Sequence, residues 1–114
     1  TDAVLGACVL SDIGEHFPSI DPTLAGADSL DLLGQAAVMA VAAGWQIEHV
    51  DATVVVENVP IAPHRAEIRA NLARALGIVP DLVSVKATTT DGLGFVGRGE
   101  GMAAVAVVTI SALS

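Results

Sequence analysis

The chain has 114 residues, enough for one domain that buries about 65% of the surface of its unfolded chain. Hydrophobic residues make up 53% of the sequence and aromatic residues only 3%, so we expect a core of Ala, Val, Leu and Ile, with enough apolar surface left over to favour a symmetric oligomer. Thirteen acidic residues against five basic ones give a net charge of −8, which argues against a nucleic acid as the partner.

The sequence also argues against a membrane protein. Its longest uncharged stretch, residues 32–47, is shorter than the roughly 20 residues that cross a bilayer. The chain opens without the basic region of a signal peptide. Its one cysteine, Cys8, leaves no internal disulfide and fits a reducing compartment. We therefore expect a cytoplasmic protein in which Cys8 is buried as a small apolar side chain.

The first half of the chain predicts two helices and a strand. Residues 1–10 read as the end of an apolar helix, which breaks at residues 11–14. Two prolines make residues 17–26 a loop. Asp28 or Ser29 caps the next helix, which continues to Val41 and closes at Gly44. Residues 46–57 are rich in β-branched side chains and predict a long strand.

The second half predicts another helix and two strands. Two prolines make residues 58–63 a loop, and Pro63 opens a helix over residues 64–76 that ends at Gly77. A strand at residues 82–88, a glycine-rich loop and a closing strand at residues 102–110 follow. Helices and strands alternate, so we expect one α/β domain, an α+β sandwich in which helices pack on one face of a mixed sheet.

The most informative segment is residues 86–101, which read KATTTDGLGFVGRGEG. Its three threonines supply hydroxyls and Asp91 supplies a carboxylate, a combination that can hold phosphate oxygens and a divalent cation together. The five glycines that follow let the backbone come close to a ligand. On these residues alone, a threonine-rich strand end followed by a glycine-rich hairpin explains the pattern equally well.

Four segments together carry a resemblance to a known family: DIG at residues 12–14, FPSIDP at 17–22, GADS at 26–29, and residues 86–101. In this order and at these spacings they resemble the 2-C-methyl-D-erythritol 2,4-cyclodiphosphate synthases of the non-mevalonate isoprenoid pathway. The resemblance covers essentially the whole chain. It implies a homotrimer with active sites between subunits. It also implies conversion of 4-diphosphocytidyl-2-C-methyl-D-erythritol 2-phosphate to the cyclic diphosphate, with release of CMP by metal-assisted intramolecular phosphoryl transfer.

The resemblance also implies which residues bind the organic parts of the substrate. Asp12 and Gly14, with Ile13 between them, hold the ribose, although a helix-ending turn is what DIG alone suggests. The segment that flanks the methylerythritol pocket is Phe17, Pro18, Ser19, Ile20 and Asp21. The loop whose backbone reads cytosine contains Val56, Glu57, Pro60, Ile61 and Ala62. Pro60 stands where the family usually has a lysine, so a positive charge near the nucleotide is lost.

The resemblance also implies that the residues after position 87 bind the phosphate end of the substrate. Thr88, Thr89 and Thr90 match phosphate-binding threonines, with Thr89 as the catalytic candidate that stabilises the transition state. Asp91 matches a carboxylate, often glutamate, that carries the Mg²⁺ or Mn²⁺ bridging the phosphates. Phe95 and Arg98 match positions that line the pocket and the central channel of the trimer. For Arg98, an ion pair with Glu100 between subunits is the alternative to substrate contact.

This chain differs from the family's pattern at the residues that bind the catalytic zinc. An Asp-x-His motif and a further histidine bind that ion in the family, and no residue of this chain matches them. His16, His49 and His64 stand elsewhere, whereas Asp2 is a candidate for the surroundings of that site. The resemblance thus implies an N-terminally incomplete domain, and we expect residues 1–114 alone to release no CMP.

Two other functions stay open at this point. A non-catalytic trimeric scaffold that binds cytidine nucleotides is the main alternative. A bare α/β oligomerisation domain is the third, and residues 86–101 speak against it.

Overall fold

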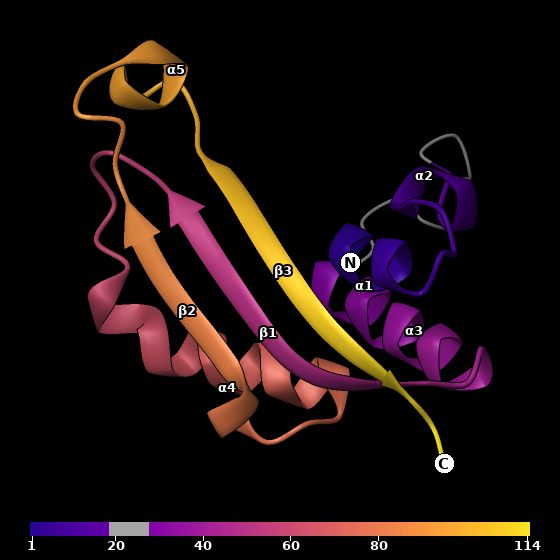
Figure 1. Ribbon diagram of the computed structural model, residues 1–114. Coiled ribbons are helices and arrows are strands. Elements are labelled where there is room, and N and C mark those ends of the chain that lie inside the picture. Colours follow the sequence, from indigo (N-terminus) through magenta and orange to yellow (C-terminus); the bar gives the residue numbers. More distant parts are fainter. Residues whose placement is uncertain (19–27) are drawn as a thin grey trace.

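The computed structural model describes residues 1–18 and 28–114. Over these ranges the chain forms a three-stranded sheet with helices on one of its faces (Figure 1). The helices are α1 (Asp2–Ala7), α2 (Ile13–His16), α3 (Ser29–Ala42), α4 (Arg65–Leu76) and α5 (Gly94–Gly97). The strands are β1 (Trp45–Val55), β2 (Val83–Thr88) and β3 (Ala103–Ala112), and two 3₁₀ turns, η2 (Ala62–His64) and η3 (Pro80–Leu82), flank α4. The predicted α/β class is confirmed.

The sheet is mixed, as predicted, with strand order β2-β1-β3. The central strand β1 runs parallel to β2, with Val50 opposite Val83, and antiparallel to β3, with Ala52 opposite Ala106. Because β1 and β2 are parallel and β3 is antiparallel, the C-terminal ends of β1 and β2 and the N-terminal end of β3 lie at the same end of the sheet. The connections at this end, at the top of Figure 1, include residues 56–59 and 89–102.

The core is aliphatic, which confirms the expectation from composition. Its larger part lies between α1, α3 and the lower half of the sheet, where Val4 and Leu5 are buried to 2% and 0% exposure. Ala36 and Ala40 of α3 are fully buried and let this helix approach the sheet closely. Burying one leucine contributes about 1.5–3 kcal/mol, so these contacts anchor the lower half of the sheet. Cys8 is also buried, as predicted, and burial raises the pKa of its thiol.

A second, smaller cluster lies under α4. Ala73 packs there with Val83 and Val85 of β2, and Ile68 and Leu72 cover the cluster at its margin. The helix ends as predicted, because Gly77 takes the left-handed conformation at a φ of 70°. Pro63 lies in the 3₁₀ turn η2, which also contains the predicted first residue of the helix, His64, so α4 begins one residue later than predicted.

Both ends of α3 also follow the sequence signals. The Asp28 carboxylate accepts a hydrogen bond from the Leu30 amide at 2.8 Å and caps the helix. Gly44, at a φ of 93°, turns the chain from α3 into β1. Two short helices, α2 and α5, were not predicted, because four residues are too few to show a helical period in the sequence.

Within the described ranges, none of the helices has both the length and the apolar character that a bilayer span requires.

Candidate functional site

The threonine segment forms a tight loop at the end of β2. The Thr89 hydroxyl donates to the Asp91 carboxylate at 3.3 Å and accepts from the Asp91 amide at 3.2 Å. The Thr90 hydroxyl donates to the Leu93 carbonyl at 2.6 Å, which closes the next turn. Thr88, Thr89 and Asp91 are exposed, whereas Thr90 is half-buried. An accessible hydroxyl and an accessible carboxylate therefore stand side by side at this edge of the sheet.

The backbone of this loop needs two unusual conformations in succession. Asp91 has a φ of 54° and Gly92 a φ of 83°, both in the left-handed region. Aspartate is among the few residues other than glycine that enter this region readily, as single residues. The turn aims the Asp91 side chain back toward the Thr89 hydroxyl.

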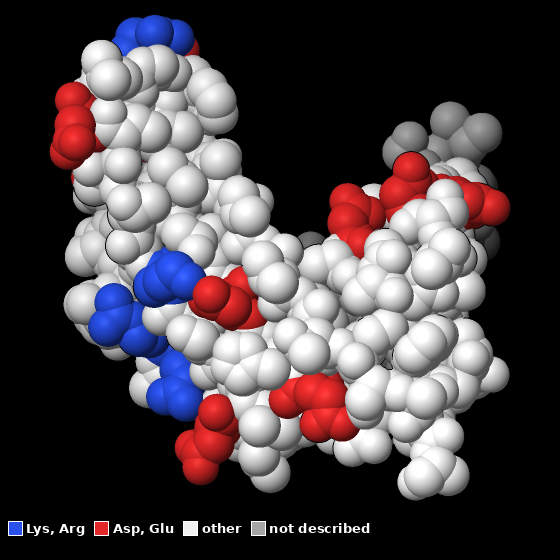
Figure 2. Space-filling model, viewed as in Figure 1, with Lys and Arg blue, Asp and Glu red and all other residues white. Residues whose placement is uncertain are grey.

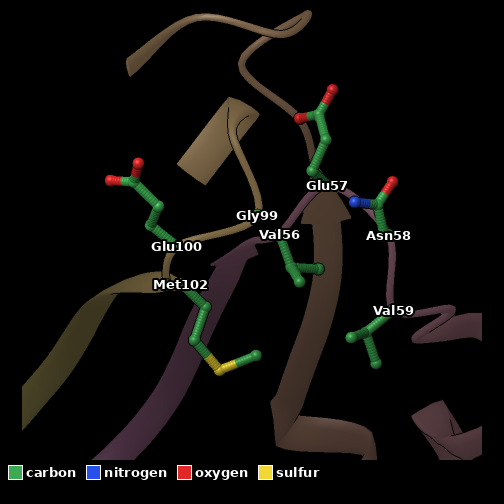
Figure 3. A pocket seen from close by; sticks show the side chains of 8 residues that line it. Val56, Glu57, Asn58, Val59, Gly99, Glu100 and Met102 are labelled. Atoms are coloured by element: carbon green, nitrogen blue, oxygen red, sulfur yellow. The ribbon is translucent and has the colours of Figure 1, made fainter. Parts of the chain in front are cut away.

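The side chain of Glu57 holds this loop from the neighbouring strand. One of its carboxylate oxygens accepts from the Thr90 amide at 3.3 Å and the other from the Gly92 amide at 3.0 Å. In Figure 3 the Glu57 side chain extends away from that of Val56, which precedes it. The sequence places Glu57 in the loop expected to read cytosine, but its side chain accepts hydrogen bonds from the loop of residues 88–93. We call this loop the phosphate loop, after the ligand that the sequence predicts for it. No motif in the sequence could have revealed this contact, which joins residues 35 positions apart.

A small cavity lies beside this loop, between the end of β1 and the start of β3 (Figure 3). Its volume is about 280 Å³, and it is lined by Val56, Glu57, Asn58, Val59, Gly99, Glu100, Gly101 and Met102. Ligand pockets generally begin near 300 Å³, so this one is at the lower limit. Of the five residues predicted for the cytosine loop, Val56 and Glu57 line this cavity, whereas Pro60, Ile61 and Ala62 lie farther along the chain toward η2.

Phe95 and Arg98 lie in and just after α5, next to the phosphate loop. Arg98 donates to both carboxylate oxygens of Glu100, at 2.8 Å and 3.1 Å. This pair lies within one chain, because residues two positions apart reach each other across the turn that follows α5. An ion pair between subunits stays a prediction. The hydrogen bond to Glu100 raises the pKa of the Arg98 guanidinium. Both side chains are exposed, so the pair adds little to stability.

The Lys86 ammonium is also engaged. It lies 2.6 Å from the Asp51 carboxylate, across the face of the sheet that carries no helices. In this arrangement neither Lys86 nor Arg98 offers an unpaired positive charge to a phosphate.

The DIG segment starts a helix and does not end one, which corrects the helix-ending turn that DIG alone suggests. The Asp12 carboxylate caps α2 by accepting from the Glu15 amide at 3.0 Å. Asp2 of α1 accepts from the Ile13 amide at 2.7 Å and so ties the segment to the core helix. Phe17 and Pro18 follow α2 and are half-buried, whereas the predicted residues Ser19, Ile20 and Asp21 lie outside the described ranges.

One chain does not bring the two predicted halves of the site together. The α2 helix, with Asp12 at its start, lies on one side of the molecule, and α5 with the threonine loop lies on the other (Figure 1). The space-filling view shows a wide hollow between them, with acidic residues along the α1–α2 side (Figure 2).

In the part of the chain that the structure describes, no three His, Cys, Asp or Glu side chains come together in a way that could hold a metal ion. These residues do not fit a zinc site, which needs at least three protein ligands. Asp91 fits a different cation. Mg²⁺ commonly binds through one or two carboxylates together with substrate phosphates and water, and Asp91 is an exposed carboxylate beside a hydroxyl.

Known proteins resemble this chain along nearly its whole length. The model of the YgbB family matches residues 1–111. The 2-C-methyl-D-erythritol 2,4-cyclodiphosphate synthase of Bordetella avium is 51% identical over 111 residues, covering 97% of this chain and 68% of that protein. The bifunctional enzyme IspD/IspF of Novosphingobium aromaticivorans is 52% identical over 109 residues, covering 96% of this chain and 28% of that protein.

Solved structures share the fold. The bifunctional IspDF from Campylobacter jejuni matches with a TM-score of 0.94 at 36% identity, over 98% of this chain and 30% of that one. IspF of Plasmodium falciparum, in a CDP complex, matches with a TM-score of 0.86 at 26% identity, over 99% of this chain and 67% of that one. The chain therefore belongs to the YgbB family, together with its 2-C-methyl-D-erythritol 2,4-cyclodiphosphate synthase relatives.

Proposed function

We propose that the protein is a cyclodiphosphate synthase acting on 4-diphosphocytidyl-2-C-methyl-D-erythritol 2-phosphate in isoprenoid biosynthesis. The observation that carries the proposal is the loop at the end of β2, where the Thr89 hydroxyl and the Asp91 carboxylate stand 3.3 Å apart and open to solvent. This loop belongs to the segment that most resembles the family. Phosphoryl transfer requires hydrogen-bond donors to the phosphate oxygens and a divalent cation that neutralises charge. The Thr89 hydroxyl is suited to the first task, and the Asp91 carboxylate is suited to binding Mg²⁺ or Mn²⁺.

The reaction is an internal displacement at phosphorus. An oxygen of the 2-phosphate attacks the β-phosphorus, a new P–O–P bond closes the ring, and the bond to the α-phosphate oxygen breaks. The electron pair of that bond leaves with CMP. Because no covalent bond to the protein forms, the protein contributes position and charge stabilisation.

The threonine loop and residues 56–62 have different tasks in this reaction. Thr89 turns its hydroxyl from Asp91 toward a phosphate oxygen and donates to it as charge develops there. Thr88 and Thr90 flank it, and the exposed Asp91 carboxylate would hold a divalent cation. A bound divalent cation offsets the negative charge of the phosphates. The small cavity that begins at Val56 receives part of the nucleotide, whose cytosine the backbone of residues 56–62 reads.

The assembly is a homotrimer in this proposal. The helix α2, which Asp12 caps, and the loop after β2, which contains Thr89, lie on opposite sides of one chain, so a substrate held by both takes them from adjacent copies. The apolar surface for such contacts exists on β3, where Val105 and Val107 are each 62% exposed.

CMP release tests the proposal against the alternative of a non-catalytic cytidine-binding scaffold. The protein in its full natural length is incubated with the substrate and Mg²⁺, and CMP and the cyclic diphosphate are followed by ³¹P NMR. Equal amounts of both products support the synthase. CDP binding in calorimetry without turnover supports the scaffold, and the absence of both contradicts both functions.

A further inference from the structure

We infer that Glu57 is a positioning residue, which fixes the backbone of Asp91 so that its carboxylate faces the cation and the phosphates. This inference rests on the proposed function, in which Asp91 carries the divalent ion. Nothing in the resemblance assigns this task to Glu57, since there only the backbone of its loop contacts cytosine.

The geometry brackets Asp91 from both sides. The backbone amides of the residues just before and just after Asp91, those of Thr90 and Gly92, donate to the two oxygens of the Glu57 carboxylate. The peptide unit that precedes Thr90 and the one that follows Asp91 are therefore held by the same carboxylate. Asp91 has a φ of 54°, a conformation that still costs an aspartate more than a glycine, and hydrogen bonds at both ends of the turn stabilise it.

Glu57 is itself well anchored. It follows Val56, which is 7% exposed and whose amide donates to the Thr88 carbonyl at 3.0 Å. This bond extends the parallel pairing of β1 with β2 by one step beyond the strands. The Glu57 carboxylate therefore ties the phosphate loop to the end of β1. A shift of the loop relative to the sheet would break both hydrogen bonds.

We call the two hydrogen bonds from the Thr90 and Gly92 amides to Glu57 the clamp, and only a carboxylate can accept both of them. Both amides are donors, so the clamp needs two acceptor atoms, and an ionised carboxylate presents acceptors only. Glutamine has one acceptor oxygen and would turn its NH₂ group toward the second amide. Both oxygens of Glu57 accept from amides of the loop, and we infer that its task is to orient Asp91.

The clamp also links two parts of the site. The backbone of residues 56–59 borders the small cavity, and the Glu57 side chain reaches the phosphate loop. When a nucleotide binds against this backbone, the phosphate loop is already ordered, so its binding loses no further conformational entropy of that loop.

The test compares Glu57→Ala and Glu57→Gln in the full-length protein, with Glu67→Gln on the exposed start of α4 as the matched control. Amide hydrogen exchange at Thr90 and Gly92 is measured by ¹⁵N NMR, and Mn²⁺ binding in the presence of CDP by electron paramagnetic resonance. Residues that orient a metal ligand typically change metal affinity or activity by about 10- to 100-fold when removed, and we expect a loss in this range for Glu57→Ala. Glu57→Gln keeps one acceptor, so we expect a smaller loss and faster exchange at one of the two amides.

A merely structural role predicts a different pattern, in which the melting temperature falls while Mn²⁺ affinity and kcat stay unchanged. That pattern overturns the inference, as does unchanged exchange at both amides in Glu57→Gln. The exchange and Mn²⁺ measurements need no turnover. A wild-type protein that binds Mn²⁺ through this loop but releases no CMP contradicts the proposed function and leaves the clamp standing.

Discussion

Gly97 of α5 lies directly against the backbone of Gly92: a Cβ atom added at position 97 would stand 2.1 Å from the Gly92 carbonyl carbon. The short helix α5 can therefore fold back onto the phosphate loop only because residue 97 has no side chain. Glu57 holds Gly92 from the other side, through the hydrogen bond at 3.0 Å. The loop that carries Asp91 is thus fixed both by packing and by hydrogen bonds.

We expect Gly97→Ala to disrupt the phosphate loop. The added methyl group meets backbone, which has no rotamer to change, and overpacking of this kind typically costs about 1–3 kcal/mol. The free energy of unfolding, measured in urea, should fall by that amount, and amide exchange at Gly92 should accelerate. Gly6→Ala in α1 is the control, because nothing lies within 4 Å of its added Cβ and alanine favours a helix. Equal effects at both glycines would contradict the close packing.

Thr89→Val should remove the catalytic hydroxyl while keeping the β-branched shape. Loss of one donor to a developing charge commonly reduces kcat by about 100-fold or more, and we expect a reduction of that order with little change in KM. Ser84→Ala, which removes an exposed hydroxyl in β2 outside the loop, is the control. If Thr89→Val turns over at the wild-type rate, the assignment of Thr89 is wrong.

Asp91→Asn should separate the backbone role of this residue from its charge. Asparagine tolerates the left-handed conformation as well as aspartate does, so the melting temperature should hardly change. The neutral amide is a much poorer ligand for Mg²⁺, so the Mg²⁺ concentration that gives half-maximal rate should rise by about 10-fold or more. An unchanged Mg²⁺ requirement would show that the cation does not bind through Asp91.

Pro60→Lys should strengthen nucleotide binding by restoring the positive charge that the family usually has there. An exposed charge contributes about 0.2–1 kcal/mol, which corresponds to about a 1.5- to 5-fold lower dissociation constant for CDP. Calorimetry at two salt concentrations checks this, because the gain should shrink as salt screens the charge. Pro60→Gln removes the proline without adding charge, and an equal gain in that variant would attribute the effect to the backbone.

Much of the fold could be predicted from the sequence because its signals are local. Asp28 caps α3, Gly77 ends α4, and the β-branched run of residues 46–57 forms β1 with a shift of one or two residues at its ends. The aliphatic core and the burial of Cys8 follow from composition. The helices α2 and α5 escaped prediction because each is a single turn, fixed by a cap or by contacts and not by periodicity.

The site was harder to predict, because its contacts join distant residues. The motif at residues 88–91 marks the phosphate loop, but nothing local shows that Glu57 clamps it or that Lys86 pairs with Asp51 across 35 positions. The pairing of Arg98 with Glu100 within the chain depends on the turn after α5, which only the three-dimensional structure reveals.

In the proposed function, the loop from Thr88 to Asp91 stabilises the transition state of phosphoryl transfer. The most direct measurement is CMP release from 4-diphosphocytidyl-2-C-methyl-D-erythritol 2-phosphate by the full-length wild-type protein and by Thr89→Val, at saturating Mg²⁺. We predict steady release of CMP together with an equal amount of cyclic diphosphate by the wild type, and a rate lower by about 100-fold in the variant. No CMP from the wild type, or the same rate from both proteins, would contradict the account.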